Sequence, residues 1–256
     1  MIALTARKYR CVALGKNSIG EIGFVLVALG MIEKESLQIV EEMPHWLAVN
    51  KPAGLIVERN KFESTTLEGL VEAYLQRSTR SPFVGVIHRL DKVTSGIVIF
   101  AKKMWALKKL NLEFQERRVQ KTYWAIITGA LPAAEGRLDH WLLKDMQEKR
   151  AQILPSPQKE AKKASLLYRT LAEHGDFKLI EIELLTGRYH QIRAQFAAVS
   201  CPIVGDLKYA EGGDAYSKEI ALHARTMTFK DPQGGHQRLL YADLPENKWW
   251  DPFREQ

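Results

Sequence analysis

The chain has 256 residues, of which 46% are hydrophobic and 26% charged, and its 37 Lys and Arg against 30 Asp and Glu give a formal net charge of +7. This apolar share can build a buried core, and it excludes intrinsically disordered, collagen-like and coiled-coil chains. The two cysteines, Cys11 and Cys201, lie far apart, which argues against a disulfide framework or a thiol-rich metal site. We therefore expect a cytoplasmic globular protein whose basic balance favours, without requiring, a phosphate-bearing partner.

The first 36 residues contain one apolar run, at positions 22–32. This run is shorter than the roughly 20 residues that cross a bilayer. It also lies far from Met1, between Glu21 and Glu33, without a clean cleavage site for a signal peptide. We expect no membrane contact and assign residues 1–36 to an N-terminal extension that either packs as a short element or has little structure.

From residue 37 onward the patterning is that of a folded domain. Apolar runs predict short strands at 37–40 and 45–50, followed by a turn at 52–54. Thr65-Thr-Leu-Glu68 is a capping-box pattern that predicts the start of a helix. The apolar residues on one face of this helix are Leu67, Leu70, Val71 and Tyr74.

Two further apolar runs, at 83–87 and 96–101, read as buried strands on either side of the polar segment 88–95. The remaining predicted elements are a helix at 104–118, strands at 121–128, 164–172 and 177–186, a helix at 191–199, and strands at 222–229 and 239–244. Helices and strands do not alternate regularly, which favours an α+β fold over a doubly wound one. We predict one domain over residues 37–256.

The polar segment after the first buried run reads His88-Arg-Leu-Asp-Lys-Val-Thr-Ser-Gly96. A carboxylate in a loop between two buried strands is held rigidly, and catalytic groups favour such loops. Arg89 and Lys92 are cations that could keep Asp91 ionised as a nucleophile or base. The alternative is an aspartate that merely caps the turn.

Two other segments are candidates for chemistry. In Thr186-Gly-Arg-Tyr-His-Gln-Ile-Arg193, Gly187 permits a sharp reversal, and the following helix N-terminus with two arginines suits an anion. The alternative there is ordinary surface cations on a helix. In Lys121-Thr-Tyr-Trp-Ala125, strand alternation places Tyr123 and Lys121 on one face, although strand aromatics are usually core residues.

Together these segments resemble the RluA-type branch of the RNA pseudouridine synthases. The matching motifs are His88-Arg-Leu-Asp91 with Thr94-Ser-Gly96, Lys121-Thr-Tyr-Trp-Ala125, and Thr186-Gly-Arg-Tyr-His-Gln-Ile-Arg193 running into Pro202-Ile-Val-Gly-Asp206 and Tyr209. Val49-Asn-Lys-Pro-Ala-Gly54 and Leu222-His-Ala224 match the family's opening and late strands. The resemblance covers about residue 37 to the C-terminus and is specific as a set.

The resemblance implies an isomerase that breaks the bond between ribose C1′ and uracil N1, turns the base, and joins C5 to C1′. It gives Asp91 the role of essential carboxylate, and leaves open whether this group attacks the sugar, attacks the base or removes a sugar proton. Tyr123 would stack on the uracil and help proton transfer at C5, and Arg193 would pair with the catalytic carboxylate. Arg89 would fill the gap that the flipped base leaves.

The resemblance also implies the architecture and the partners. We expect a central mixed, largely antiparallel sheet flanked by helices, no cofactor, no metal, and a monomer that binds ribosomal or transfer RNA. The predicted RNA-binding residues are His88, Arg89, Lys121, Arg188 and His190. A lysine- and arginine-rich helix surface around 102–118 is a further candidate for RNA contact, or else a solvated face.

Several positions depart from the family pattern without removing a catalytic candidate. Gln195 stands where many relatives have His, and Asp231 precedes Pro232 where His is common. The chain has no phosphate-binding Gly-rich loop and no Asp-Phe-Gly, which excludes a protein kinase despite His88-Arg89. The serious alternative is a non-catalytic RNA-binding or ribosome-assembly protein on the same scaffold.

Overall fold

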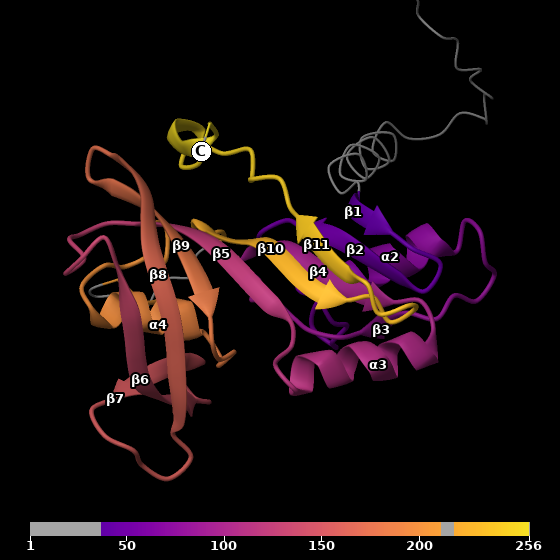
Figure 1. Ribbon diagram of the computed structural model, residues 1–256, viewed down its shortest axis with the longest axis horizontal. Coiled ribbons are helices and arrows are strands. Elements are labelled where there is room, and N and C mark those ends of the chain that lie inside the picture. Colours follow the sequence, from indigo (N-terminus) through magenta and orange to yellow (C-terminus); the bar gives the residue numbers. More distant parts are fainter. Residues whose placement is uncertain (1–36, 211–217, 256) are drawn as a thin grey trace, which may run out of the picture. The chain divides into compact units, whose positions relative to one another are not determined.

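The computed structural model describes residues 37–210 and 218–255, and Figure 1 shows the arrangement of their helices and strands. The N-terminal extension predicted over residues 1–36, with its apolar run, lies outside the described residues. Among the described residues, no helix is long and apolar enough to cross a bilayer.

Eleven strands of the described residues form a single sheet. Their bounds are β1 Gln38–Glu42, β2 Trp46–Lys51, β3 Gly85–Val86, β4 Ser95–Ala101, β5 Gln120–Ile127, β6 Glu135–Asp145, β7 Arg150–Leu154, β8 Lys162–His174, β9 Phe177–Leu184, β10 Leu222–Lys230 and β11 Gln237–Tyr241. The strand order is β1-β2-β4-β10-β5-β9-β8-β6-β7, with β3 paired to β4 and β11 paired to β10. Only the β10–β4 pair is parallel, so the prediction of a mixed, largely antiparallel sheet is confirmed.

Among the described residues, three α-helices flank this sheet: α2 (Leu67–Leu75), α3 (Met104–Gln115) and α4 (Gln191–Ala198). Alternate residues of β2 and β4 point to opposite faces of the sheet, because side chains on a strand alternate. One face packs with the buried residues of α2, and the other packs with Leu110 of α3. The helix α4 lies against the other half of the sheet and packs on β6 and β7 (Figure 1).

The start of α2 differs in detail from the predicted capping box. Thr66, not Thr65, is the N-cap, and its hydroxyl accepts the Gly69 N–H at 3.1 Å. Glu68 does not reach back along its own helix but accepts the Arg59 N–H at 2.9 Å. The helix therefore fixes the preceding loop, which lines the cleft described below.

The sequence analysis did not predict β6 and β7. Both strands are rich in charged and exposed positions, and only Leu138, Leu142 and Ala151 are buried on them. Their period-2 apolar signal is therefore weak. The missed hairpin matters for function, because its turn lies at the edge of the cleft.

The polar segment around Asp91 leaves the sheet because the strand before it is short. A strand was predicted over 83–87, but only Gly85 and Val86 pair with β4. His88 continues the pairing with its side chain: its Nε2 accepts the Ile99 N–H of β4 at 3.1 Å. Residues 89–94 then form an irregular loop that returns directly into β4.

Candidate active site

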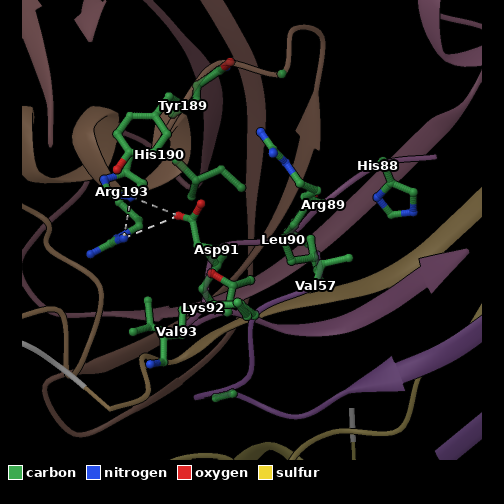
Figure 2. A pocket seen from close by; sticks show the side chains of 18 of the residues that line it. Val57, His88, Arg89, Leu90, Asp91, Lys92, Val93, Tyr189, His190 and Arg193 are labelled. Atoms are coloured by element: carbon green, nitrogen blue, oxygen red, sulfur yellow. Dashed lines mark hydrogen bonds and ion pairs between the residues drawn. The ribbon is translucent and has the colours of Figure 1, made fainter. Parts of the chain in front are cut away.

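The Asp91 carboxylate points out of its loop into a cleft (Figure 2). The main-chain oxygen of Asp91, not its side chain, accepts the Thr94 N–H that closes the turn, at 3.1 Å. The carboxylate instead accepts a hydrogen bond from Arg193 Nη1 at 3.3 Å. The turn therefore leaves the carboxylate available, which decides against the role of a simple turn cap.

Arg193 of α4 is held between two carboxylates. Its Nε and Nη2 donate to the two oxygens of Asp206, at 2.7 and 2.8 Å, while Nη1 faces Asp91. The Arg193 side chain is 5% exposed and the Asp206 side chain 1% exposed. This bidentate contact fixes the plane of the guanidinium, because Nε and Nη2 both donate to Asp206 and hold Nη1 toward Asp91.

His190 lies beside Arg193, close to Asp91, and carries no charge (Figure 2). Arg193 Nη1 donates to His190 Nε2 at 3.1 Å, so that ring nitrogen is an acceptor and the proton resides on Nδ1. Nδ1 then donates to the Tyr209 hydroxyl at 2.9 Å. Burial and the nearby cations lower the pKa of His190 to about 2, so its 3.6 Å approach to Asp91 is not an ion pair.

The turn that precedes α4 is shaped by His190 rather than by Gly187. His190 adopts the left-handed conformation with φ +50°, whereas Gly187 does not. The Gln191 side chain closes this turn, because its Oε1 accepts the Arg188 N–H at 3.0 Å. The chain therefore reverses at His190, and the prediction that Gly187 makes this reversal is wrong.

Lys51 is a buried cation behind Asp91 that the sequence analysis did not assign. Its Nζ donates to the carbonyls of Pro52, Leu55 and Lys92 at 2.9, 2.7 and 3.1 Å. The Lys92 carbonyl also accepts the Gly54 N–H at 2.7 Å. Lys51 thus ties the turn after β2 to the residue that follows Asp91.

Different neighbours of Asp91 shift the pKa of its carboxyl in opposite directions. About 28% of its side chain is open to the cleft, yet the surrounding protein raises its pKa above the usual value of 3.8 by desolvation. Arg193 and Lys51 lower the pKa, and Asp206 raises it further. The balance is a carboxylate with a raised pKa that depends on Arg193 to stay charged.

Tyr123 and Lys121 enter the cleft from β5. Burial, and the charge of Asp91, raise the pKa of the Tyr123 hydroxyl above 10, so the hydroxyl keeps its proton at neutral pH. The Lys121 ammonium lies 5.3 Å from the centre of the Phe114 ring, and burial lowers its pKa. Tyr123 is 7% exposed, so it is both a core residue and a lining residue.

The predicted RNA-binding residues fall into two groups. Arg89 and Lys121 line the cleft, and so do Arg188 and His190 next to α4. His88 also borders the cleft but is set apart from Asp91 (Figure 2), and it stacks on Phe114 with ring centres 4.8 Å apart. Burial lowers the pKa of His88 to about 3, so this ring is neutral.

Asp206 and Lys51 are the neighbours of Asp91 that sequence reasoning did not assign. Both sit inside motifs that carried the family resemblance, Asn-Lys-Pro and Val-Gly-Asp. Their place in these motifs is the signal that could have found them, but the spacing of the motifs does not show that Asp206 binds Arg193. Gln195, which stands where many relatives have His, donates through Nε2 to carbonyls of β6 and β8 and so anchors α4.

The cleft has a volume of about 1620 Å³, which exceeds that of most sites for small molecules. Ten basic side chains line it against three acidic ones. Within residues 37–210 and 218–255, no group of three or more His, Cys, Asp or Glu side chains could hold a metal ion. The site fits a large polyanion acted on by a carboxylate.

Comparison with known proteins agrees with this chemistry. The sequence model of the RNA pseudouridylate synthase family matches residues 45–198. The tRNA pseudouridine synthase C of Vibrio parahaemolyticus is 31% identical over 85% of this chain and 94% of its own length. The dual-specificity RNA pseudouridine synthase RluA of Vibrio vulnificus is 32% identical over 85% of this chain and 90% of its own length.

Solved structures show the same fold. Human RNA pseudouridylate synthase domain containing 4 superposes with a TM-score of 0.70 at 21% identity, covering 88% of this chain and 94% of that one. Human RNA pseudouridylate synthase domain containing 1 gives 0.68 at 27% identity, covering 85% and 87%. The chain belongs to the RNA pseudouridylate synthase family, in its RluA-type branch, and is an isomerase.

Proposed function

We propose that the protein isomerises specific uridines of structured ribosomal or transfer RNA, with Asp91 as the essential carboxylate and with the target base flipped out of its stack. The observation that carries this proposal is the pairing of Asp91 with Arg193 at 3.3 Å in a large basic cleft that Tyr123 also lines. Desolvation opposes ionisation of Asp91, and the guanidinium counteracts that effect. A partly exposed, charged carboxylate is what a covalent or proton-removal step needs.

Tyr123 supplies the aromatic ring and a proton in this proposal. Its hydroxyl stays protonated at neutral pH because its pKa is raised. The Tyr123 ring lines the cleft, and in this proposal the uracil stacks on it. Stacking on the base and proton transfer at C5 therefore fall to one side chain.

In this proposal Arg89 enters the RNA once the base has left. A base within a stacked helix cannot reach Asp91 unless it is extruded. Arg89 is paired with Glu58 at 2.6 Å, with the two side chains 67% and 43% exposed. Pairs as exposed as this contribute about 0–1 kcal/mol, so RNA can displace Glu58 at low cost.

Both ribosomal and transfer RNA are supported as substrate classes by the relatives. The Vibrio parahaemolyticus relative is described as a tRNA enzyme. A large-subunit ribosomal enzyme of Neisseria meningitidis is 32% identical over 84% of this chain and 60% of its own length. Pseudouridine mapping in total RNA from a deletion strain and its parent would identify the target nucleotides.

The alternative is a non-catalytic RNA-binding or ribosome-assembly protein. The test is Asp91→Asn, which keeps the size of the side chain and removes its charge. We expect this variant to form no pseudouridine in the target RNA while its RNA affinity stays within about threefold, because a single charge of the cleft changes. Undiminished turnover would overturn the role of Asp91, and a wild-type protein without turnover on any mapped target would favour the alternative.

A further inference from the structure

Strand β10 lies between the two strands that position Asp91 and Tyr123. On one side it pairs with β4, which the Asp91 loop enters, and on the other side it pairs with β5, which carries Tyr123. Within β10, Ala224 is opposite Gly96 of β4 and also opposite Tyr123 of β5. The position of β10 therefore controls how far apart the Asp91 loop and Tyr123 lie.

The contact between β4 and β10 is short and close. The two strands pair at only two positions, Ser95 with His223 and Gly96 with Ala224. Gly96 has φ +116°, and a Cβ atom there would overlap the main chain of Ala224, so only glycine permits this approach. Pairing over two positions gives the backbone little hold on the end of the Asp91 loop, and side chains must supply the rest.

A buried hydrogen bond between side chains joins the two strands at this point. His223 Nε2 faces the Ala242 carbonyl at 3.4 Å, and a carbonyl only accepts, so the ring proton resides on Nε2. Nδ1 is then an acceptor, and the Ser95 hydroxyl donates to it at 2.9 Å. Burial lowers the pKa of His223 to about 4. The ring is therefore neutral, and the bond persists, at neutral pH.

Neither partner of this bond lies in the cleft. Ser95 is 2% exposed and His223 0%. Leu222 lines the cleft, and the next residue, His223, points to the opposite face of the sheet because side chains alternate along a strand. There its ring packs against Trp250, with ring centres 6.0 Å apart.

The burial of the pair also excludes a second catalytic centre. A serine nucleophile must be accessible to its substrate, and its histidine base is oriented by a further group, most often a carboxylate. Ser95 is buried, and His223 Nε2 faces a main-chain carbonyl. Any effect of the pair on turnover must therefore pass through the residues that it holds.

We propose that the hydrogen bond between Ser95 and His223 is a positioning element for the isomerisation, which holds the end of the Asp91 loop against β10 and so keeps the Asp91 carboxylate in place relative to Arg193 and Tyr123. This inference rests on the proposed function and adds two positioning residues to the same site. Without the bond, the loop can shift along β10 and lengthen the 3.3 Å contact between Asp91 and Arg193. A reacting group displaced by about 1 Å can lose on the order of 100-fold in rate.

The first test is Ser95→Ala, which removes the hydroxyl and leaves His223 Nδ1 without its donor. We expect kcat for a target stem-loop to fall by a factor on the order of 10 to 100. KM should stay within about threefold, because the substitution removes no contact to RNA. The acid limb of the kcat profile should move to higher pH, because Arg193 lowers the pKa of Asp91 and now holds it less closely.

The second test compares two amides at position 223. In His223→Asn, an amide oxygen takes the place of Nδ1 and can accept from Ser95, so kcat should stay within about threefold of wild type. In His223→Gln, the amide takes the place of Nε2, which keeps the contact to Ala242 and leaves Ser95 without its acceptor. This variant should match Ser95→Ala. Equal losses of kcat in the two amide variants would overturn the proposal.

A double variant tests whether the two residues act through one bond. Ser95→Ala and His223→Gln remove the same interaction, so their effects on kcat should overlap instead of multiplying. We expect Ser95→Ala/His223→Gln to be no more than about threefold slower than the slower single variant. Losses that multiply would overturn the proposal, because they would mean that each residue acts on its own.

Phe229→Leu is the matched control for stability. Phe229 lies at the other end of β10 from His223, is 1% exposed, and packs in the core around Trp46. Its substitution should lower the free energy of unfolding, measured in urea, and leave kcat and the acid limb unchanged. A fall in kcat that Phe229→Leu reproduces would overturn the positioning role, because the loss would then follow from stability alone.

The outcomes separate this inference from the proposed function. If wild type forms no pseudouridine in any mapped target, the proposed function fails. If Asp91→Asn keeps full turnover, the role of Asp91 fails with it. If wild type is active and Asp91→Asn is inactive, while Ser95→Ala and His223→Gln keep the kcat and the acid limb of wild type, only the positioning role of the pair fails.

Discussion

The Asp206 carboxylate accepts two hydrogen bonds from the Arg193 guanidinium, at 2.7 Å from Nε and 2.8 Å from Nη2. Both side chains are buried. The guanidinium is planar, so fixing two of its nitrogens fixes the third. Asp206 thereby directs Nη1 toward Asp91 and acts as a positioning residue for that carboxylate.

Asp206→Asn should separate this positioning role from simple packing. We expect kcat to fall on the order of 100-fold, because small misplacements of a reacting group have effects of that size. KM should change little. The negative charge of Asp206 raises the pKa of Asp91, so its loss should move the acid limb of the kcat profile to lower pH. Stopped-time pseudouridine assays between about pH 4 and 8, the range in which a carboxyl with a raised pKa titrates, provide the measurement.

A companion variant, Arg193→Gln, should move the same limb in the opposite direction. Arg193 lowers the pKa of Asp91, and without it the carboxyl keeps its proton to higher pH. The buried Asp206 then loses its partner, so we expect the free energy of unfolding to fall by about 3–5 kcal/mol. An acid limb and a kcat that stay at their wild-type values in Asp206→Asn, while the free energy of unfolding falls, would show that Asp206 affects only stability.

Tyr123→Phe keeps the aromatic ring and removes the proton that the hydroxyl carries. If the ring stacks on the base and the hydroxyl transfers a proton, KM should stay within about threefold of wild type while kcat falls by a factor on the order of 10² to 10⁴. Single-turnover rates and RNA affinity, measured separately, distinguish the two effects. A fall in affinity without a fall in the single-turnover rate would contradict this division of roles.

A truncated variant provides the control for Tyr123. The ring packs in the core cluster of β5, β9 and α4. Tyr123→Ala should therefore weaken RNA binding and also lower the free energy of unfolding by about 3–5 kcal/mol. The phenylalanine variant should remain close to wild type in stability.

Glu58→Gln should release Arg89 from its ion pair. The pair is exposed and contributes little to stability, so we expect KM for RNA to fall by up to about fivefold at low salt, with the difference lost at high salt. Glu173→Gln, which removes the partner of Lys178 in an exposed pair on the β8–β9 hairpin, is the matched control. A higher KM for Glu58→Gln than for wild type would show that Glu58 helps to place Arg89 on the RNA.

The sequence predicted the part of the site that lies in continuous motifs. Asp91 and Arg193 are 102 positions apart and contact each other, and both were recognisable because each sits in its own motif. The strand that leads out of the Asp91 loop was also predictable, since β4 is a continuous apolar run. Its burial on both faces of the sheet is what produces such a run.

The rest depends on tertiary context that local patterns do not contain. The β6–β7 hairpin was missed because only a few of its residues face the core. Lys51 was missed because a lysine in a strand predicts exposure, whereas here three carbonyls satisfy its ammonium. These carbonyls belong to a turn and to a distant loop, and no spacing in the sequence brings them together.

Lys51 offers a prediction about stability and pH. Its side chain is fully buried, and burial lowers its pKa from 10.5 to about 7, against the opposing charge of Asp91. Between these two pH values the unfolded chain holds a proton that the folded chain has lost, so stability must rise with pH across this window. Below pH 7 both states are protonated and the contribution is constant.

The measurement compares urea unfolding of wild type and Lys51→Met from about pH 6 to 10, a range that spans the titration of a buried amine. Lys51→Met leaves three carbonyls without a donor, which lowers the free energy of unfolding of the variant by an amount that does not vary with pH. The informative quantity is therefore how the difference in stability between the two proteins changes with pH. The stability of wild type relative to Lys51→Met should rise as the pH increases. In an Asp91→Asn background the rise should begin at lower pH, because the carboxylate that favours the charged lysine is gone. A difference that is flat with pH would mean that the three carbonyls keep Lys51 charged in the folded protein.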